Sequence, residues 1–243
     1  MSHQGAPASE RTEVWVFFDA NNVYVSARCY ETRPDRAIAN ELRRDNLNVV
    51  QNDNFGFLLD TFHDRRSSFS FCINPIGGRC DGQSSNEGQY NGDWNGVWKV
   101  ETGRWDGGWT IEMALPFRTL RYPAKPVQDW GIQILRINRW KNEVVFMTPS
   151  DPSRGSAGFM LASKFADVVG LEAPPPGRNI EVKPYTIGSL TTDRLSRPAK
   201  SNATDGNVGL DVKYAVKQSI AADFTELRNA GCSVTSGTSL PSI

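Results

Sequence analysis

Hydrophobic and polar residues alternate with a period of two near the start of the chain. The alternating stretches, residues 13–18 and 23–31, flank Asp19-Ala20-Asn21-Asn22, whose residue types favour a tight turn. Because successive side chains of a strand point to opposite faces of a sheet, this pattern predicts an antiparallel hairpin with one face in a core.

Similar segments continue through the first two thirds of the chain. Apolar residues recur at every second position in residues 55–59 and 69–73, and the polar run 63–67 between them predicts a second hairpin. Three more strands are predicted at residues 97–104, 109–115 and 130–140.

Many short strands with no helical period between them favour an all-β fold, an antiparallel β-sandwich. The inward strand faces predict a core of Val14, Val16, Phe18, Val23, Val25, Phe55, Phe57, Phe69, Phe71, Ile111 and Met113. Trp98 and Trp109 occupy strand positions and are also interpreted as core residues, and Cys29 as a small buried hydrophobe.

Two segments depart from the strand pattern. Ile38 and Leu42 are four residues apart among polar neighbours, which predicts a short surface helix in residues 34–44. Residues 81–96 are rich in Gly, Asn, Asp, Ser and Gln, which predicts a long loop. Long ordered loops of this kind often carry function.

The chain divides into four predicted segments. Residues 7–173 form the sandwich domain, and residues 174–178 form a stiff linker with the sequence PPPGR, because three prolines cannot continue a strand ladder. Residues 179–225 contain a few further strands. Residues 226–243 show no strand pattern and are predicted to be a disordered tail.

Charge and composition limit the classes of partner that the chain is expected to bind. The chain has 27 Lys and Arg against 27 Asp and Glu, so no long-range field favours nucleic acid as a partner. Seven tryptophans, with 21 Gly and 14 Pro, suit short strands, tight turns and exposed aromatic surfaces. The start MSHQGAPASERTE has neither the basic region nor the apolar stretch of a signal peptide, so none is expected in this chain.

The four cysteines do not form a disulfide framework in a chain of this length. Cys72 and Cys80 flank a Pro/Gly turn closely enough to pair in an oxidising compartment. The sequence does not decide between a Cys72–Cys80 disulfide and two free thiols.

Four stretches follow one another in order: NDNFGFLLDTFHDRR, FSFCINPIGGRCDG, WNGVWKVETGRWDGGWTIEMALPFRTLRY and WGIQILRINRWKNE. This combination resembles the carbohydrate-binding family 9 type domain that, in one bacterial family, precedes an outer-membrane β-barrel of unassigned function. The resemblance covers residues 7–171. It implies a jelly-roll sandwich and non-catalytic binding of polysaccharide or oligosaccharide, linked to carbohydrate catabolism. It also implies a location at the outer membrane or in the periplasm.

The stretches NIEVKPYTIGSL and VGLDVKYAV, followed by ADFT, resemble the opening strands of that family's barrel. The resemblance therefore implies that residues 179–225 begin an outer-membrane β-barrel that is incomplete here. Intact relatives carry an export signal and a further strand or two before PASERTE, and ELRNAGCSVTSGTSLPSI after Thr225 resembles the product of a shifted reading frame. About three strands cannot close a barrel, because closure in a membrane takes at least about eight.

Sugar binding needs an aromatic platform beside hydrogen-bonding side chains, and residues 90–109 supply both. Trp94 and Trp105 are the stacking candidates because both stand in a turn-like context of Gly, Asp and Asn. The remaining candidates for carbohydrate binding are Tyr90, Asn91, Asp93 and Arg104. The same tryptophans could instead anchor loops.

The resemblance predicts no cofactor other than a structural calcium ion, which family 9 type modules of secreted xylanases carry. Oxygen ligands of the right type are Asp53, Asp60, Asp64, Asp81, Glu87 and Asp93. Turn capping is the alternative role for the same side chains.

Catalysis finds little support in the sequence. A glycosidase needs two facing carboxylates, and Glu112 in WTIEMALP has no evident partner, so it is interpreted as a polar residue on the solvent face. His3 and His63 are far apart, and no nucleophile elbow is present. The sequence predicts a binding module rather than an enzyme. The alternatives are a structural or interaction domain that caps a barrel without binding sugar and, third, a glycoside hydrolase.

Overall fold

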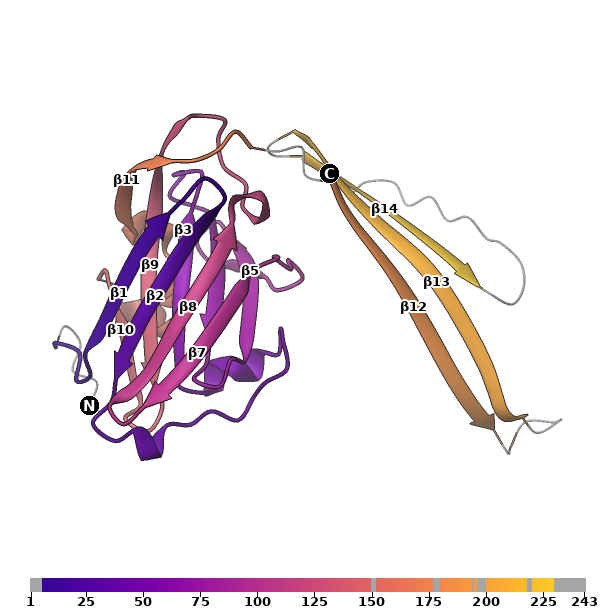
Figure 1. Cartoon of the computed structure of the whole chain (residues 1–243), viewed down its shortest axis with the longest axis horizontal. Helices are drawn as coiled ribbons and strands as arrows, with labels where there is room; N and C mark the ends of the chain where they lie inside the picture. Colours follow the sequence, from indigo (N-terminus) through magenta and orange to yellow (C-terminus); the bar gives the residue numbers. More distant parts are fainter. Residues whose placement is uncertain are drawn as a thin grey trace. The chain divides into compact units, whose positions relative to one another are not determined.

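A computed structural model describes residues 6–149, 152–176, 180–193, 195, 200–217 and 220–229. Backbone contacts divide the chain into two units, residues 1–176 and 177–243. The first unit contains two antiparallel sheets that face each other (Figure 1), so the predicted antiparallel β-sandwich is confirmed.

The front sheet in Figure 1 has four strands in the order β1-β2-β8-β7. They are β1 (Thr12–Phe18), β2 (Asn22–Tyr30), β7 (Lys99–Trp105) and β8 (Gly108–Pro116). Asp19 accepts hydrogen bonds from the backbone N–H groups of Asn21 and Asn22 at 2.7 and 2.8 Å, which closes the predicted β1–β2 turn.

The second sheet follows the order β10-β9-β3-β4-β5-β6, and β11 also pairs with β9. Its strands are β3 (Asn54–Asp60), β4 (Ser68–Ile73), β5 (Arg79–Ser85), β6 (Gln89–Asn91), β9 (Val127–Asn138), β10 (Glu143–Phe146) and β11 (Ala166–Glu172). The 3₁₀ turns are η1 (Pro34–Arg36), η2 (Leu47–Gln51), η3 (Phe117–Thr119), η4 (Pro152–Met160) and η5 (Ala162–Lys164).

The core lies between the sheets, where the inward side chains of both form one cluster. The predicted core residues Val23, Val25, Phe55, Phe57, Phe69, Phe71, Ile111 and Met113 are buried in it, as are Trp98, Trp109 and Cys29. Val14 is partly buried and packs against the cluster. The period-two pattern therefore identified most of the core.

The prediction that Val16 and Phe18 are core residues was wrong, because they are 37% and 41% exposed. Their register opposite Val25 and Val23 does put them on the inward face. However, β1 is the border strand of its sheet, so these side chains have a neighbouring strand on one side only. A side chain of a border strand can thus point to the inward face and still be exposed to solvent.

The predicted helix in residues 34–44 was also wrong beyond the 3₁₀ turn η1. After this turn, several backbone N–H groups donate to side chains and not to backbone carbonyl oxygens. Ile38 N–H donates to Asp53 Oδ2 at 2.5 Å, and Asn40 and Glu41 N–H donate to Asn52 Oδ1 at 2.9 and 3.1 Å. These polar anchors replace the helical hydrogen-bond ladder.

The predicted loop at residues 81–96 is a strand hairpin up to residue 91. β5 pairs with β6, and residues Asn86 and Glu87 in the turn adopt positive φ angles of 49° and 57°. The side chain of Tyr90 lies so close to Gly82 that a Cβ atom there would be 2.5 Å from the Tyr90 hydroxyl oxygen. Gly82 therefore leaves room for a large ring on the neighbouring strand and is not a sign of a loop.

Two other predictions concern the sandwich surface. Glu112 is exposed on the outer face of β8, as predicted. Cys72 and Cys80 lie directly opposite each other on β4 and β5 as free thiols. Their contact and burial raise the pKa of Cys72. A disulfide between them in an oxidising compartment stays a prediction.

The second unit is a three-stranded antiparallel sheet of β12 (Ile180–Asp193), β13 (Lys200–Lys217) and β14 (Ile220–Asn229). The pattern-based strands in residues 179–225 are thus present, and β14 continues past residue 225 into the segment predicted to be a tail. Val182, Val208 and Leu210 are exposed on one face. Residues 230–243 lie outside the described residues. In the part of the chain that the structure describes, no helix is long and apolar enough to cross a membrane.

Candidate functional site

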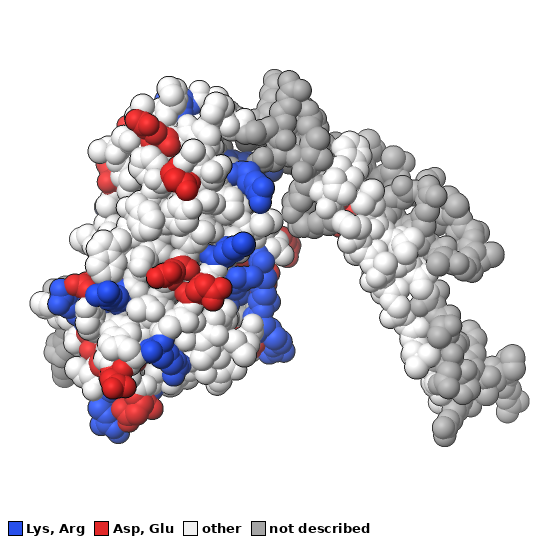
Figure 2. Space-filling view, in the orientation of Figure 1, with Lys and Arg blue, Asp and Glu red and all other residues white. Residues whose placement is uncertain are grey.

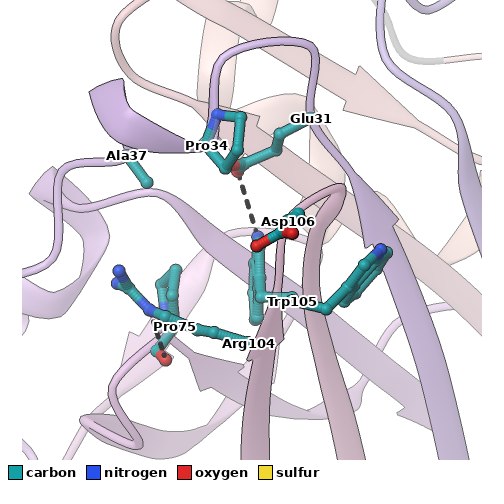
Figure 3. A pocket seen from close by; sticks show the side chains of 9 residues that line it. Glu31, Pro34, Ala37, Pro75, Arg104, Trp105 and Asp106 are labelled. Carbon is teal, nitrogen blue, oxygen red and sulfur yellow. Dashed lines mark hydrogen bonds between the residues drawn. The ribbon is translucent and has the colours of Figure 1, made fainter.

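A pocket of about 310 Å³ lies at one end of the sandwich, where several connections meet (Figure 3). The turn between β7 and β8 forms one wall, the segment after β2 another, and the β4–β5 turn a third. Its lining residues are Glu31, Pro34, Ala37, Pro75, Arg104, Trp105, Asp106, Gly108 and Trp109.

Trp105 ends β7 and is 37% exposed. Its ring packs edge-on against Tyr30 of β2, with ring centroids 5.7 Å apart and planes at 90°. The turn that presents it requires glycine: Gly108 has a φ of +143°, and a Cβ there would lie 2.0 Å from the carbonyl oxygen of Cys29. The tryptophan is therefore held by a tight turn and by one ring neighbour while part of its surface stays open.

Arg104 and Trp105 leave β7 on opposite sides of the strand, as consecutive strand residues must (Figure 3). Arg104 is exposed and reaches across the pocket to Pro75, whose carbonyl oxygen accepts from its Nε at 3.5 Å. Asp106, in the turn itself, is exposed as well. The mouth of the pocket thus carries one guanidinium and one carboxylate, while the Trp105 ring points to the other side of β7 and lies at the rim (Figure 3).

A buried polar cluster forms the floor. Glu31 is nearly inaccessible to solvent, and its Oε1 accepts from Trp109 Nε1 at 3.1 Å and from Arg136 Nη2 at 3.3 Å. Arg136 donates further to the carbonyl oxygens of Arg11 and Tyr30 and to Thr12 Oγ1, at 2.9–3.0 Å. These bonds tie the first two strands to β8 and β9 beneath the pocket.

Burial raises the pKa of Glu31, and the nearby carboxylate of Asp53 raises it further, although the Arg136 guanidinium lowers it. The loss of hydration is the largest of these effects. Since the carboxyl group is already bonded to Trp109 and Arg136, its geometry suits a structural role in the floor.

A partly exposed indole at the rim and a guanidinium and a carboxylate at the mouth are the types of group that a small polyhydroxylated ligand can contact. An aromatic ring can cover the apolar face of a sugar while charged side chains bond its hydroxyls. The volume is at the lower end of ligand pockets, which run from about 300 to 1,000 Å³. The pocket therefore has room for a short ligand or for the end of a longer one.

Two of the six predicted binding residues, Arg104 and Trp105, line this pocket. The other four do not. Trp94 is partly buried, and its ring lies 4.9 Å from Phe69 and 5.9 Å from Phe71 between ring centroids. This is the loop-anchor arrangement that the sequence left open for it.

Tyr90, Asn91 and Asp93 lie on and just after β6 and are exposed. The Tyr90 hydroxyl donates to the carbonyl oxygen of Asp81 at 3.1 Å. Burial raises the pKa of Tyr90 to about 12. Whether these three residues bind sugar stays a prediction.

The sequence did not identify Glu31, Pro34 or Pro75 as site residues. Glu31 and Pro34 come from the segment after β2 and Pro75 from the β4–β5 turn, and they come close to Trp105 only through the fold. Glu31 carried one usable signal, an acidic residue directly after a strongly alternating strand, but its partner Arg136 is 105 positions away. Contacts between residues so far apart in sequence depend on how the two sheets pack, and residue spacing does not reveal this packing.

Most of the candidate calcium ligands have other partners. Asp53, Asp60, Asp64, Asp81 and Glu87 all accept backbone N–H hydrogen bonds in turns or connections. Asp81 also accepts from Trp98 Nε1 and Arg44 at 3.0 Å each. Among the described residues, no group of three or more His, Cys, Asp or Glu side chains is arranged to hold a metal ion.

Comparison with known proteins gives structural neighbours only. No family model and no curated protein matches the chain. Two structures of a family 9 carbohydrate-binding module from Caldicellulosiruptor kristjanssonii, one with cellotriose and one with glucose, are each 16% identical with a TM-score of 0.46. They match 72% of this chain and 80% and 82% of their own chains.

A third neighbour, from Bacteroides uniformis, is provisionally described as a carbohydrate-binding protein. It has a TM-score of 0.53 at 11% identity and covers 69% of this chain and 80% of its own. At that identity the likeness shows a shared fold and no more.

Proposed function

We propose that residues 7–173 form a non-catalytic carbohydrate-binding module whose site is the pocket at Trp105. The observation that carries the proposal is the partly exposed indole of Trp105 at the rim of a pocket that Arg104 and Asp106 also line, over a floor fixed by Glu31. The shared fold with the Bacteroides uniformis protein supports the same function. The ligand class is an oligosaccharide or a polysaccharide, in keeping with a role in carbohydrate catabolism.

Gel retardation tests this proposal. The purified chain is run through native gels that contain xylan, soluble cellulose derivatives or other glucans, and at least one polysaccharide is expected to slow it. Trp105→Ala should weaken binding at least about tenfold, because ~1.4 kcal/mol of lost stacking corresponds to a factor of ten. Its thermal unfolding should hardly change, since the ring is partly exposed.

Tyr90→Ala is the matched control, because Tyr90 is 39% exposed and belongs to the second sheet. Retained binding in Tyr90→Ala and lost binding in Trp105→Ala would support the pocket. The opposite result would move the site to the β5–β6 hairpin. No retardation by any polysaccharide would refute carbohydrate binding itself.

In this proposal, the sandwich is a periplasmic domain, and the second unit supplies the first strands of an outer-membrane barrel. One exposed face of β12 and β13 is apolar, with Val182, Val208 and Leu210, which is the pattern of barrel strands. A soluble hairpin can show the same alternation. Cell fractionation of an intact relative would test the location.

A further inference from the structure

The two sheets of the sandwich differ in what their outer faces carry. On the front face, which Figure 2 shows in the orientation of Figure 1, Lys and Arg side chains are interspersed with Asp and Glu, so this face selects no partner of one charge. The outer face of the second sheet brings together two thiol groups, those of Cys72 on β4 and Cys80 on β5. These are the only groups of nucleophilic sulfur that meet in the described part of the chain.

The register of β4 and β5 places the two cysteines directly opposite each other. Phe71 and Ile73 point into the core, so Cys72, which stands between them, points to the outer face. Directly opposite residues of an antiparallel pair share a face, so Cys80 points outward as well. The two thiols therefore lie side by side on one surface of the sheet.

The spacing of this pair suits a disulfide. Directly opposite residues have Cα atoms about 4.5–5.5 Å apart, within the range of about 4.4–6.8 Å that a disulfide spans. The thiol groups are in contact, and this contact, followed by burial, raises the pKa of Cys72. An S–S bond between Cys72 and Cys80 thus needs no change in strand pairing.

The other cysteines do not compete for this pairing in the described structure. Cys29 is fully buried in the core and belongs to the front sheet, and burial raises its pKa to about 12. Cys232 lies outside the described residues. The pair on β4 and β5 also differs in access, since Cys80 is 4% exposed and Cys72 is partly exposed.

The cysteine pair closes the hairpin whose turn forms the third wall of the pocket. Only one residue pair separates Cys72 and Cys80 from that turn. The turn contains Pro75, whose carbonyl oxygen accepts from Arg104 Nε at 3.5 Å. A covalent bond at the base of the turn would therefore restrict the movement of a pocket wall and of a contact to Arg104.

We propose that Cys72 and Cys80 form a disulfide that holds this wall of the pocket, and that the wall is looser in the dithiol form. An oxidising compartment, such as the periplasm proposed above, favours the disulfide. The role of the wall rests on the proposed function. The bond itself rests on the placement of the two thiols alone.

The oxidant is a second disulfide, of a small molecule or of a protein. The thiolate of Cys72, the more exposed partner, attacks one sulfur of the oxidant, forms a mixed disulfide and releases one oxidant thiol. Cys80 then attacks the Cys72 sulfur, and the second oxidant thiol leaves. Two electrons and two protons pass from the pair to the oxidant. Because the pKa of Cys72 is raised, this oxidation should become faster as the pH rises.

Mass spectrometry of the full chain tests the bond. A Cys232→Ser variant is equilibrated with reduced and oxidised glutathione at several ratios, and free thiols are then alkylated. We expect the oxidised chain to lose two hydrogen atoms and to yield linked peptides that contain Cys72 and Cys80. Cys80→Ser is the matched control and should show no such loss. Cys72→Ser replaces it if Cys80→Ser does not fold.

Urea unfolding and amide hydrogen exchange test the effect on the wall. The disulfide should raise the equilibrium constant of folding by up to about a hundredfold, because it restricts the unfolded chain. Exchange in residues 73–79 should be slower in the oxidised chain than in the reduced chain, since the hairpin opens less often. In Cys80→Ser, both quantities should be the same under oxidising and reducing conditions.

Three results would overturn the proposal. They are the absence of an intramolecular bond at every glutathione ratio, a bond from Cys72 to Cys29, and equal exchange of residues 73–79 in the two redox states. None of these measurements uses a glycan. Failure of the disulfide would therefore leave sugar binding to be decided by gel retardation, and failure of sugar binding would leave the disulfide intact.

Discussion

Replacing Glu31 tests how the floor of the pocket is held. In Glu31→Ala, Trp109 Nε1 and Arg136 Nη2 both lose their acceptor in a buried site. Removing one partner of a buried ion pair costs about 3–5 kcal/mol. Arg136 keeps three other acceptors, so we expect the lower end, about 3 kcal/mol of the free energy of unfolding.

Glu31→Gln should cost clearly less. The amide oxygen can still accept from Trp109 and Arg136, so the hydrogen bonds remain. Moreover, the raised pKa of Glu31 shows that burial disfavours the carboxylate more than Arg136 favours it. The acceptor atom, and not its charge, is therefore expected to hold the cluster.

The pH dependence has a definite sign. A carboxyl whose folded pKa lies above its ordinary value of 4.5 binds protons more tightly in the folded state. Its stabilising effect is complete below pH 4.5 and is lost as the pH rises through the raised value. The stability advantage of the wild type over Glu31→Gln should thus shrink with rising pH.

Urea unfolding of the three proteins, repeated from pH 4.5 upward, measures both effects. Glu112→Gln, at an exposed carboxylate on β8, is the control and should change stability by less than about 0.5 kcal/mol. Equal destabilisation by Glu31→Ala and Glu31→Gln would show that the charge matters most. A loss below about 1 kcal/mol in Glu31→Ala would refute the structural role.

Three further predictions concern the sandwich. Phe71→Ala should cost about 3–5 kcal/mol in urea unfolding, because the ring is fully buried; a loss below about 1 kcal/mol would contradict its place in the core. Trp94→Ala should lower stability by roughly 2 kcal/mol, since its partly buried ring packs on Phe69 and Phe71, and unchanged stability with lost glycan binding would make it a site residue. The Arg43 side chain lowers the pKa of Glu41 to about 2, so stability from this pair should be lost as pH falls from 4.5 to 2; an acid unfolding curve unchanged by Glu41→Gln would exclude it.

The sequence predicted which face of a strand points inward better than it predicted how deeply the residues on that face are buried. Val25 and Phe57 are buried as expected because each lies in a strand with neighbours on both sides. Val16 has the same alternation but lies at a border, which depends on strand order. Local composition cannot reveal strand order, because the hydrogen-bond partners of a strand are far away in sequence.

The candidate site shows the same division. Arg104 and Trp105 were predictable because an aromatic and a charged residue stand together before a Gly/Asp turn. Glu31 was not, since its role depends on Arg136 of a strand in the other sheet. Sequence spacing can identify site residues that stand together in one turn. Site residues that meet because two sheets pack together cannot be identified in this way.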